Sequence, residues 1–124
     1  MDPLTLALFA IFQVKHFIAD FPLQSTYMLG KQADDWSFVR PLAAHASVHA
    51  LATLLIVLAV RPELWWLALV DFLVHFLVDR FKAGARYLGR YRDPSEKAFW
   101  NALGFDQMLH HLTHLGIIWA LVAP

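Results

Sequence analysis

The sequence predicts an all-α membrane protein whose four transmembrane helices form an antiparallel bundle, with interfacial helical segments in the cytoplasmic loops. The first observation is composition, because 59% of the residues are hydrophobic, compared with about 45–50% in typical domains. The second is a set of four long apolar segments, each able to cross a hydrocarbon core of about 30 Å. They lie at residues 3–21, 42–60, 64–81 and 105–123. The third is that every segment carries ionisable side chains four residues apart.

The remaining totals exclude several classes of protein. The formal net charge is zero, so no basic face is available to neutralise nucleic-acid phosphates. The chain has no cysteine, which excludes disulfides and thiolate metal sites. The N-terminus lacks the basic start and cleavage site of a signal peptide, so its first apolar segment is expected to be retained. We therefore predict one integral membrane domain over residues 1–124, in contact with the lipid bilayer and not with nucleic acid.

Sequence signals mark the ends of the first two segments. Pro22 ends residues 3–21, because the residue before a proline is disfavoured in the helical conformation. Residues 23–41 are polar and contain aromatic side chains suited to a headgroup region, so they predict an interfacial loop or short helix. An Arg-Pro dipeptide then ends the second segment, residues 42–60.

The stretch between the third and fourth segments is basic and aromatic, which predicts a second interfacial region. Asp93 is suited to the N-cap of a short surface helix, and Pro94 to its first position. Residues 105–123 are only marginally hydrophobic. A span of this kind is expected to need helix partners in the membrane.

The distribution of basic residues predicts the topology. The stretch from Arg80 to Gly104 carries six of the ten Lys and Arg residues, so we expect it to face the cytoplasm. Because the four spans alternate in direction, both termini are then predicted outside the cytoplasm. Lys15 lies within the first span, and its side chain is expected to extend to the headgroups.

With this topology, one His/Asp or His/His pair of every span lies at the same depth near the cytoplasmic face. Each pair is spaced i, i+4, so its two side chains occupy one helix face about 5.4 Å apart. The aspartates and His45 lie nearest the cytosol, and the other histidines lie one turn deeper. The eight predicted metal ligands are His16, Asp20, His45, His49, His75, Asp79, Asp106 and His110.

Eight nitrogen and oxygen ligands around a bundle axis are suited to two divalent transition-metal ions bridged by carboxylates. Zn²⁺, Fe²⁺ and Mn²⁺ all accept such ligands, and we favour zinc. Four other residues are expected to contact the ligands or to add to them: Asp71, His114, Gln24 and Gln107. His111 points about 100° away from His110 around the helix and is not expected to bind the metal. A hydrogen-bonded polar core or a proton relay is the alternative interpretation of these residues.

A pair of metal ions held by these residues suggests hydrolysis of a phosphoester. Water bound to such ions has a pKa near 7 and can supply hydroxide to a phosphoester. Asp20 and Asp106 are candidate catalytic bases. Arg80, Lys82 and Arg86 are candidates for binding the substrate, either an anionic lipid or a phosphorylated small molecule. The sequence leaves a homo-oligomer open.

Four motifs that span nearly the whole chain resemble an uncharacterised bacterial family of small integral membrane proteins, which implies a place in the bacterial inner membrane. These motifs are KHFIADFPLQ, HASVH, DFLVHFLVDRFK and DQMLHHLTH. HFLVD and HASVH are also similar, more distantly, to motifs of prokaryotic membrane-bound metal-dependent hydrolases, which are related to helical zinc-dependent phospholipase C enzymes. This second resemblance implies a hydrolase of a phosphoester or lipid-linked substrate, although the chain lacks the N-terminal tryptophan and glutamate ligands of the phospholipases.

Two alternatives use the same residues. The HHLTH cluster and the membrane location suggest a di-iron membrane oxygenase or desaturase, although such sites are dominated by histidine and four aspartates occur here. Four short helices leave little room for a substrate cavity, which favours a non-enzymatic metal carrier, a sensor or a partner subunit. A coloured, oxygen-reactive iron protein would support the first alternative. Labile metal occupancy without a pocket over the metals would support the second.

Overall fold

The computed structural model describes residues 2–124, and four α-helices account for most of them. The helices are α1 (Pro3–Asp20), α2 (Val39–Val60), α3 (Leu67–Ala83) and α4 (Lys97–Val122). Four short 3-10 segments connect them: η1 (Tyr27–Gln32), η2 (Trp36–Phe38), η3 (Pro62–Leu64) and η4 (Leu88–Arg90). No strand occurs between residues 2 and 124, so the all-α prediction is confirmed.

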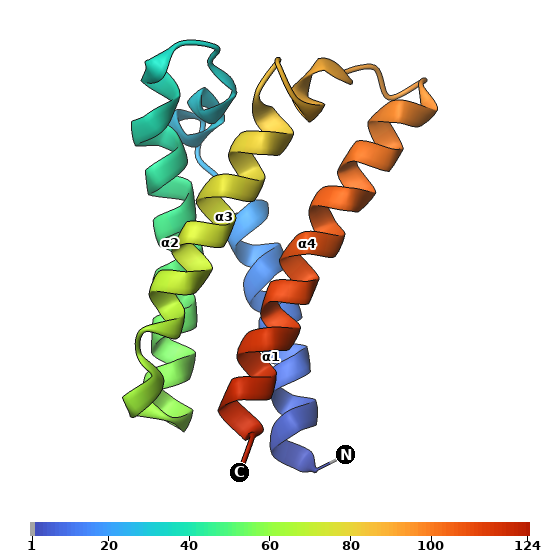
Figure 1. The fold of residues 1–124 in the computed structure, drawn as a ribbon. Coiled ribbons are helices and arrows are strands. Elements are labelled where there is room, and N and C mark those ends of the chain that lie inside the picture. The colour runs from blue at the N-terminus through green and yellow to red at the C-terminus, as the bar shows by residue number, and fades with distance from the viewer. Residues whose placement is uncertain (1) are drawn as a thin grey trace.

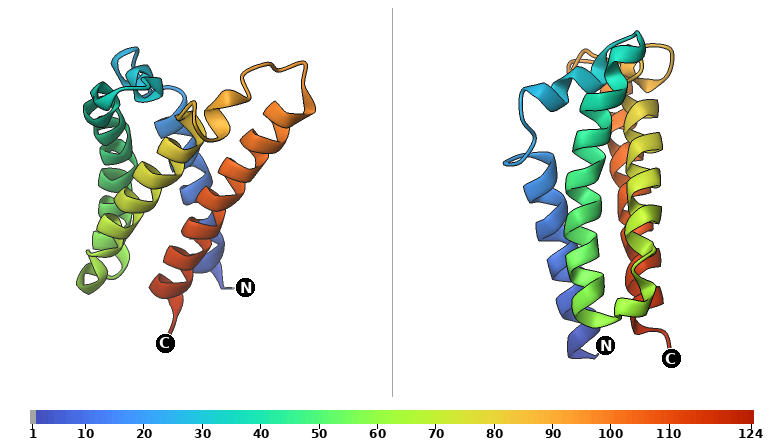
Figure 2. Two further views of the ribbon diagram at one scale, coloured as in Figure 1. Left: turned by 45° about the horizontal axis from the view of Figure 1, so that its top comes forward. Right: turned by 90° about the vertical axis from the view of Figure 1, so that its left-hand side faces the viewer.

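Successive helices run in opposite directions (Figure 1). Both chain ends and η3 lie at one end of the molecule, and η1, η2 and η4 lie at the other, which we call the loop end. α1 and α3 each contact both α2 and α4, so the four helices surround a common interior. The left view of Figure 2 shows that the loop ends of α2 and α4 lie far apart.

Around much of the interior, polar side chains are buried and apolar side chains are exposed, which is the reverse of the distribution in a soluble protein. On α3 three ionisable residues spaced four apart are buried, while leucines at the same spacing are exposed. The buried residues are Asp71, His75 and Asp79, and the exposed ones are Leu69, Leu73 and Leu77, which are 56–66% exposed. Polar side chains that face the interior of a helix bundle, with apolar side chains facing outward, are expected where lipid replaces water as the solvent.

An apolar core fills the end of the molecule that holds the termini. It consists of Leu8, Phe12, Val57, Leu67, Ile117, Ile118 and Leu121. The Phe12 ring lies 5.2 Å from the His114 ring, which marks the boundary between this core and the polar interior. The polar groups therefore occupy the part of the interior between the apolar core and the loop end.

Two of the helices are long and apolar enough to cross a membrane, namely Pro3–Asp20 and the helical stretch Trp36–Val60. α3 does not reach this level, because it is 17 residues long and carries the charged residues Asp71, Asp79, Arg80 and Lys82. In α4 the His, Asp and Gln side chains lower the mean hydropathy. Membrane association thus has weak support from two helices, and four transmembrane spans stay a prediction.

The predicted boundaries differ most at α4. This helix begins at Lys97, with Glu96 as its N-cap, rather than near residue 105. The separate surface helix expected after Asp93 is absent between residues 93 and 105, because its residues form the first turns of α4. Asp93 instead accepts a hydrogen bond from the Ser95 amide at 2.9 Å. No proline occurs in residues 97–105, and the cost of Gly104, about 1 kcal/mol, does not end the helix.

Candidate metal centre

All eight residues predicted as metal ligands lie together in the interior, and we call this set the His/Asp cluster. Each helix contributes two of them one turn apart, as the i, i+4 spacing requires. Seven of the eight are buried, and Asp20, at the end of α1, is half-buried. Long unbroken helices on all four sides hold these side chains in place.

Asp20 contacts the imidazoles of two helices. Its carboxylate lies 3.1 Å from His16 Nε2, 3.3 Å from His45 Nε2 and 2.9 Å from His49 Nε2. Among residues 2–124, no lysine or arginine forms an ion pair with this carboxylate. In a tetrahedral zinc site with bonds of about 2.0–2.1 Å, ligand atoms lie about 3.3 Å apart. The spacing of these oxygen and nitrogen atoms therefore fits a metal ion.

Asp79 on α3, like Asp20 on α1, contacts the imidazoles of two helices. Its Oδ2 lies 3.0 Å from His45 Nε2, and its Oδ1 lies 3.3 Å from His110 Nε2. His45 thus lies between the carboxylates of Asp20 and Asp79. The neighbouring Asp106 completes a group with Asp79 and His110 in which the ligand atoms lie within 4.8 Å of one another.

The deeper histidines stack around the interior axis. The ring centroids of His49 and His75 lie 3.9 Å apart, and those of His75 and His110 lie 4.3 Å apart. The His16 ring lies 5.5 Å from His49 and 5.4 Å from His110. All four helices therefore contribute an imidazole to this layer.

The orientation of His75 leaves one ring nitrogen free for a ligand. Its Nδ1 lies 3.0 Å from both the carboxylate and the backbone oxygen of Asp71, whereas its buried Nε2 has no hydrogen-bond partner. His110 repeats this arrangement, with Nδ1 2.9 Å from the Asp106 backbone oxygen. A metal-binding histidine usually donates its other N–H to a carboxylate or carbonyl in this way.

Four three-residue groups have ligand atoms close enough to hold an ion. They are Asp20/His45/His49, Asp79/Asp106/His110, His16/His49/His75 and Asp71/His75/His114. The first two share no residue, so both could hold an ion at the same time. The third lies between them and shares His49 with the first.

Lys15 occupies the fourth group, and the prediction that its side chain extends to the headgroups is wrong. The side chain is only 4% exposed, and its Nζ lies 2.8 Å from Asp71 Oδ2 and 3.4 Å from His114 Nε2. Thr53 donates a second hydrogen bond to Asp71 Oδ2 at 2.6 Å. The carboxylate of Asp71 is therefore neutralised by an ammonium group while it orients His75. Periodicity does not reveal this pairing, because it depends on how α1 and α3 are rotated against each other.

The other predicted neighbours of the ligands divide into two groups. Gln107 lies beside the cluster, with its Oε1 3.1 Å from His16 Nε2, and it donates to Asp106 at 3.0 Å. Gln24 follows the end of α1 and forms no side-chain hydrogen bond within residues 2–124. His111 is half-buried and belongs to none of the three-residue groups.

Two lysines contact the cluster from the loop end. Lys31 on η1 lies 3.0 Å from Asp79 Oδ2, and Lys82 on α3 lies 3.3 Å from Asp106 Oδ2. Lys82 was among the predicted substrate-binding residues, but Lys31 was not. The position of Lys31 depends on the packing of η1 against α2, where a Cβ on Gly30 would lie 2.9 Å from Pro41 Cγ. The glycine beside Lys31 was the one sequence signal of this close approach.

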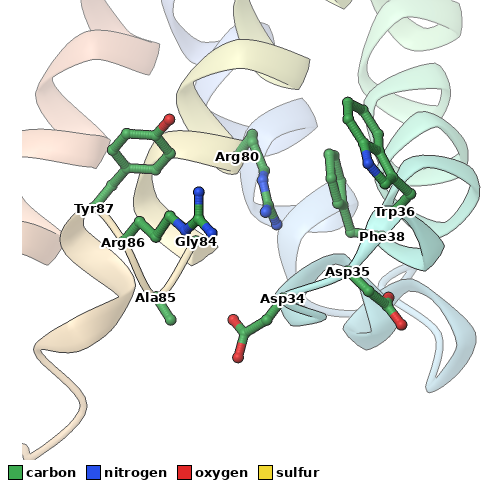
Figure 3. A pocket seen from close by; sticks show the side chains of 9 residues that line it. All are labelled: Asp34, Asp35, Trp36, Phe38, Arg80, Gly84, Ala85, Arg86 and Tyr87. Atoms are coloured by element: carbon green, nitrogen blue, oxygen red, sulfur yellow. The ribbon is translucent and has the colours of Figure 1, made fainter.

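Arg80 and Arg86, the other predicted substrate-binding residues, line a separate cavity of about 630 Å³ (Figure 3). Arg80 donates to the Ala33 carbonyl at 2.9 Å and lies 3.6 Å from the centre of the Phe38 ring. This cavity also contains Asp34 and Asp35. Hydrogen bonds from Ser37 lower the pKa of Asp35. The two acids offset the charge of the two arginines, so this cavity is a poor anion site.

Residues 8–123 match the model of a protein family described as a protein of unknown function, DUF3307. The chain belongs to this family. The match includes every residue of the His/Asp cluster as well as Lys15, Lys31 and Lys82. Comparison with curated proteins and with solved structures gave no match.

Proposed function

We propose that this DUF3307 protein is a metal-dependent hydrolase with four transmembrane helices and a dinuclear centre near one membrane face. The observation that carries the proposal is the convergence of three carboxylates and five buried imidazoles, from all four helices, on one interior region. A single buried histidine is commonly a hydrogen-bonded core residue, but carboxylates at this density are costly in an apolar setting unless each is paired with a cation. Lys31 and Lys82 pair with Asp79 and Asp106, whereas Asp20 has no lysine or arginine partner among residues 2–124.

The surface of the helices supports the membrane part of the proposal. Large apolar side chains are exposed along all four helices, for example Phe17, Leu55, Leu77 and Leu112, each more than 50% exposed. Contiguous exposed apolar surface of this extent is unusual in a soluble monomer. We infer that lipid covers it, and that the polar residues lowering the hydropathy of α3 and α4 are hidden from lipid in the interior.

Two ions fit the arrangement of the ligand groups. One ion would be held by Asp20, His45 and His49, and the other by Asp79, Asp106 and His110, because these groups share no residue. His45 lies 3.0 Å from Asp79, so the two groups adjoin. His16 and His75 are available to complete either coordination shell. Nitrogen and carboxylate ligands without sulfur are compatible with zinc, iron or manganese, and we favour zinc.

Such ions activate a bound water for hydrolysis by lowering its pKa to about 7. The protein's own contribution would be to hold the ligands and to accept the proton. Asp106 could fill both roles with its two oxygens, because Oδ1 is buried without a hydrogen-bond partner while Oδ2 is 3.0 Å from Gln107 Nε2 and 3.3 Å from Lys82. Asp20 contacts three imidazoles and is better suited to metal binding.

A cavity of about 290 Å³ reaches Asp79 from the loop end. Access of this kind favours an enzyme over a closed carrier or a purely structural subunit, since a substrate must approach the metal-bound water.

Elemental analysis of protein purified in neutral detergent without chelator tests the metal centre. We expect two transition-metal ions per chain in the wild type and at most one in His49→Ala and in Asp79→Asn. His111→Ala is the matched control, because this histidine is outside the ligand groups, and it should retain two. A wild type without stoichiometric metal would contradict the proposal.

The hydrolytic activity needs a separate test with a chromogenic phosphate ester. The wild type should hydrolyse it, lose the activity with a chelator and regain it with zinc, while His49→Ala stays inactive and His111→Ala behaves as the wild type. If fully metal-loaded wild type is no faster than His49→Ala, the hydrolase assignment is wrong although the metal centre stands.

A further inference from the structure

The 290 Å³ cavity at the loop end is formed by four parts of the chain that meet above Asp79. Lys31 comes from η1, Lys82 from α3, Arg92 from the loop after η4, and Phe99 from the first turn of α4. Gln32, Ala83, Gly89 and Tyr91 complete the lining. Its volume is near the lower end of the range for small-molecule sites, about 300–1,000 Å³.

The charge of this cavity is positive. Three cationic side chains line it, and Asp79 is its one carboxylate among residues 2–124. That carboxylate is a candidate metal ligand, and a bound metal ion would further reduce its negative charge. The cavity would then present only cations to a ligand, in contrast to the larger cavity where two acids face Arg80 and Arg86.

The lysines connect the cavity to the cluster. Lys31 Nζ lies 3.0 Å from Asp79, and Lys82 Nζ lies 3.3 Å from Asp106. The Lys82 side chain is 41% exposed and that of Lys31 is 13% exposed, so both ammonium groups border the cavity and the cluster at once. An anion held by them would therefore lie directly beside the metal ligands of α3 and α4.

The third cation is oriented by the loop itself. Arg92 Nε donates to the Gly89 carbonyl at 2.7 Å, which leaves the terminal nitrogens of the guanidinium without a hydrogen bond among residues 2–124. A guanidinium and two ammonium groups at one place match the charge and the several acceptor oxygens of a phosphoryl group. The Tyr91 and Phe99 rings provide apolar walls for the organic part of such a ligand.

We propose that this cavity binds the phosphoryl group of the substrate through Lys31, Lys82 and Arg92, with the reactive phosphorus facing Asp79 and Asp106. This inference rests on the proposed function and specifies its substrate class as a phosphate ester. It also replaces Arg80 and Arg86 as substrate-binding residues. A lipid headgroup and a soluble phosphate ester both present this chemistry, and the two arms of the test below distinguish them.

Isothermal titration calorimetry of the metal-loaded protein in neutral detergent tests the inference. One arm titrates inorganic phosphate, and the other titrates mixed micelles containing a short-chain phosphatidic acid, with phosphatidylcholine micelles as the blank. We expect one site per chain, and a loss of affinity of about ten-fold or more in Lys82→Met and in Arg92→Met. Lys97→Met, an exposed cation outside the cavity, should bind as the wild type does.

The outcomes separate the two proposals. Binding in the phosphate arm indicates a soluble substrate, and binding in the lipid arm alone indicates a headgroup; both support the cavity. Metal-loaded wild type that binds in neither arm, or variants that bind like the wild type, would overturn the inference and leave the metal centre intact. If Lys82→Met also loses metal, Arg92→Met decides, because Arg92 contacts no candidate ligand. A wild type without metal instead contradicts the proposed function.

Discussion

The buried ion pair between Lys15 and Asp71 neutralises the carboxylate of the group Asp71/His75/His114. Asp71, His75 and His114 have the geometry of a metal group, but the Lys15 ammonium lies 2.8 Å from the carboxylate and supplies the positive charge in place of an ion. Thr53 donates to the same oxygen. Under the proposed function, Lys15 therefore takes the place of an ion in this group, whereas Asp20 has no lysine or arginine partner among residues 2–124.

Replacing Lys15 by methionine should destabilise the protein strongly. Both partners are almost completely buried, and removing one charge of such a pair typically costs about 3–5 kcal/mol. The double variant with Asp71→Asn should recover most of this loss, since no unpaired charge is left. Thermal unfolding in detergent measures the effect, with Lys97→Met as the exposed control. Equal stability of Lys15→Met and Lys97→Met would show that the pair does not form.

The imidazole ligands predict how metal binding depends on pH. An imidazole must be neutral to bind metal, and its ordinary pKa is about 6.5. Zinc affinity should therefore be highest above this pH and fall as the pH decreases through it. Competition with a chelator between pH 5.5 and 8.5 measures the slope. An affinity that does not change over this range would exclude histidine ligands.

At the level of helices and loops, residues repeated along one helix face could be predicted from the sequence, whereas the contacts of Lys31 and Lys15 could not. His75 and Asp79 were placed on one buried face, because a helix repeats its geometry every turn and the pattern survives in the sequence. Lys31 could not be assigned to the cavity, because a 3-10 segment has no long repeat that fixes where a side chain points. Lys15 was misplaced because a long cationic side chain near a helix end suits either a headgroup or a buried acid.

The loop between α3 and α4 depends on Gly89. A Cβ at this position would lie 2.2 Å from the Ala83 carbonyl oxygen and 2.7 Å from that of Gly84, and both are backbone atoms that cannot rotate away. Gly89→Ala should therefore displace the loop, destabilise the protein by about 1–3 kcal/mol and weaken phosphate binding through Arg92.

Gly104→Ala provides the matched control for this change. Apart from its chain neighbours and the nearby backbone of α4, no heavy atom lies within 4 Å of a Cβ at Gly104. This is an exposed position within α4, so alanine should stabilise the helix by about 0.5–1 kcal/mol. Thermal unfolding and phosphate titration of both variants test the prediction. If Gly89→Ala matches Gly104→Ala in both measurements, the loop does not shape the cavity.

At the scale of the whole molecule, the alternating helices place both termini opposite the loop end (Figure 2). Because the chain has no cysteine, single cysteines can report the topology. In intact cells a membrane-impermeant maleimide should label Pro124→Cys, whereas Ser95→Cys should react only after permeabilisation. Labelling of both positions from the same side would contradict four transmembrane spans.

The proposed metal centre requires ligands from all four helices to meet around two ions. X-ray absorption spectroscopy of the purified, metal-loaded protein measures this directly. We expect a first shell of nitrogen and oxygen atoms at about 2.0–2.2 Å, including histidine scattering, and a metal–metal distance of about 3.5–4 Å that disappears in Asp79→Asn. A shell of water oxygens without histidine scattering, unchanged in His49→Ala, would show that the His/Asp cluster does not hold the metal.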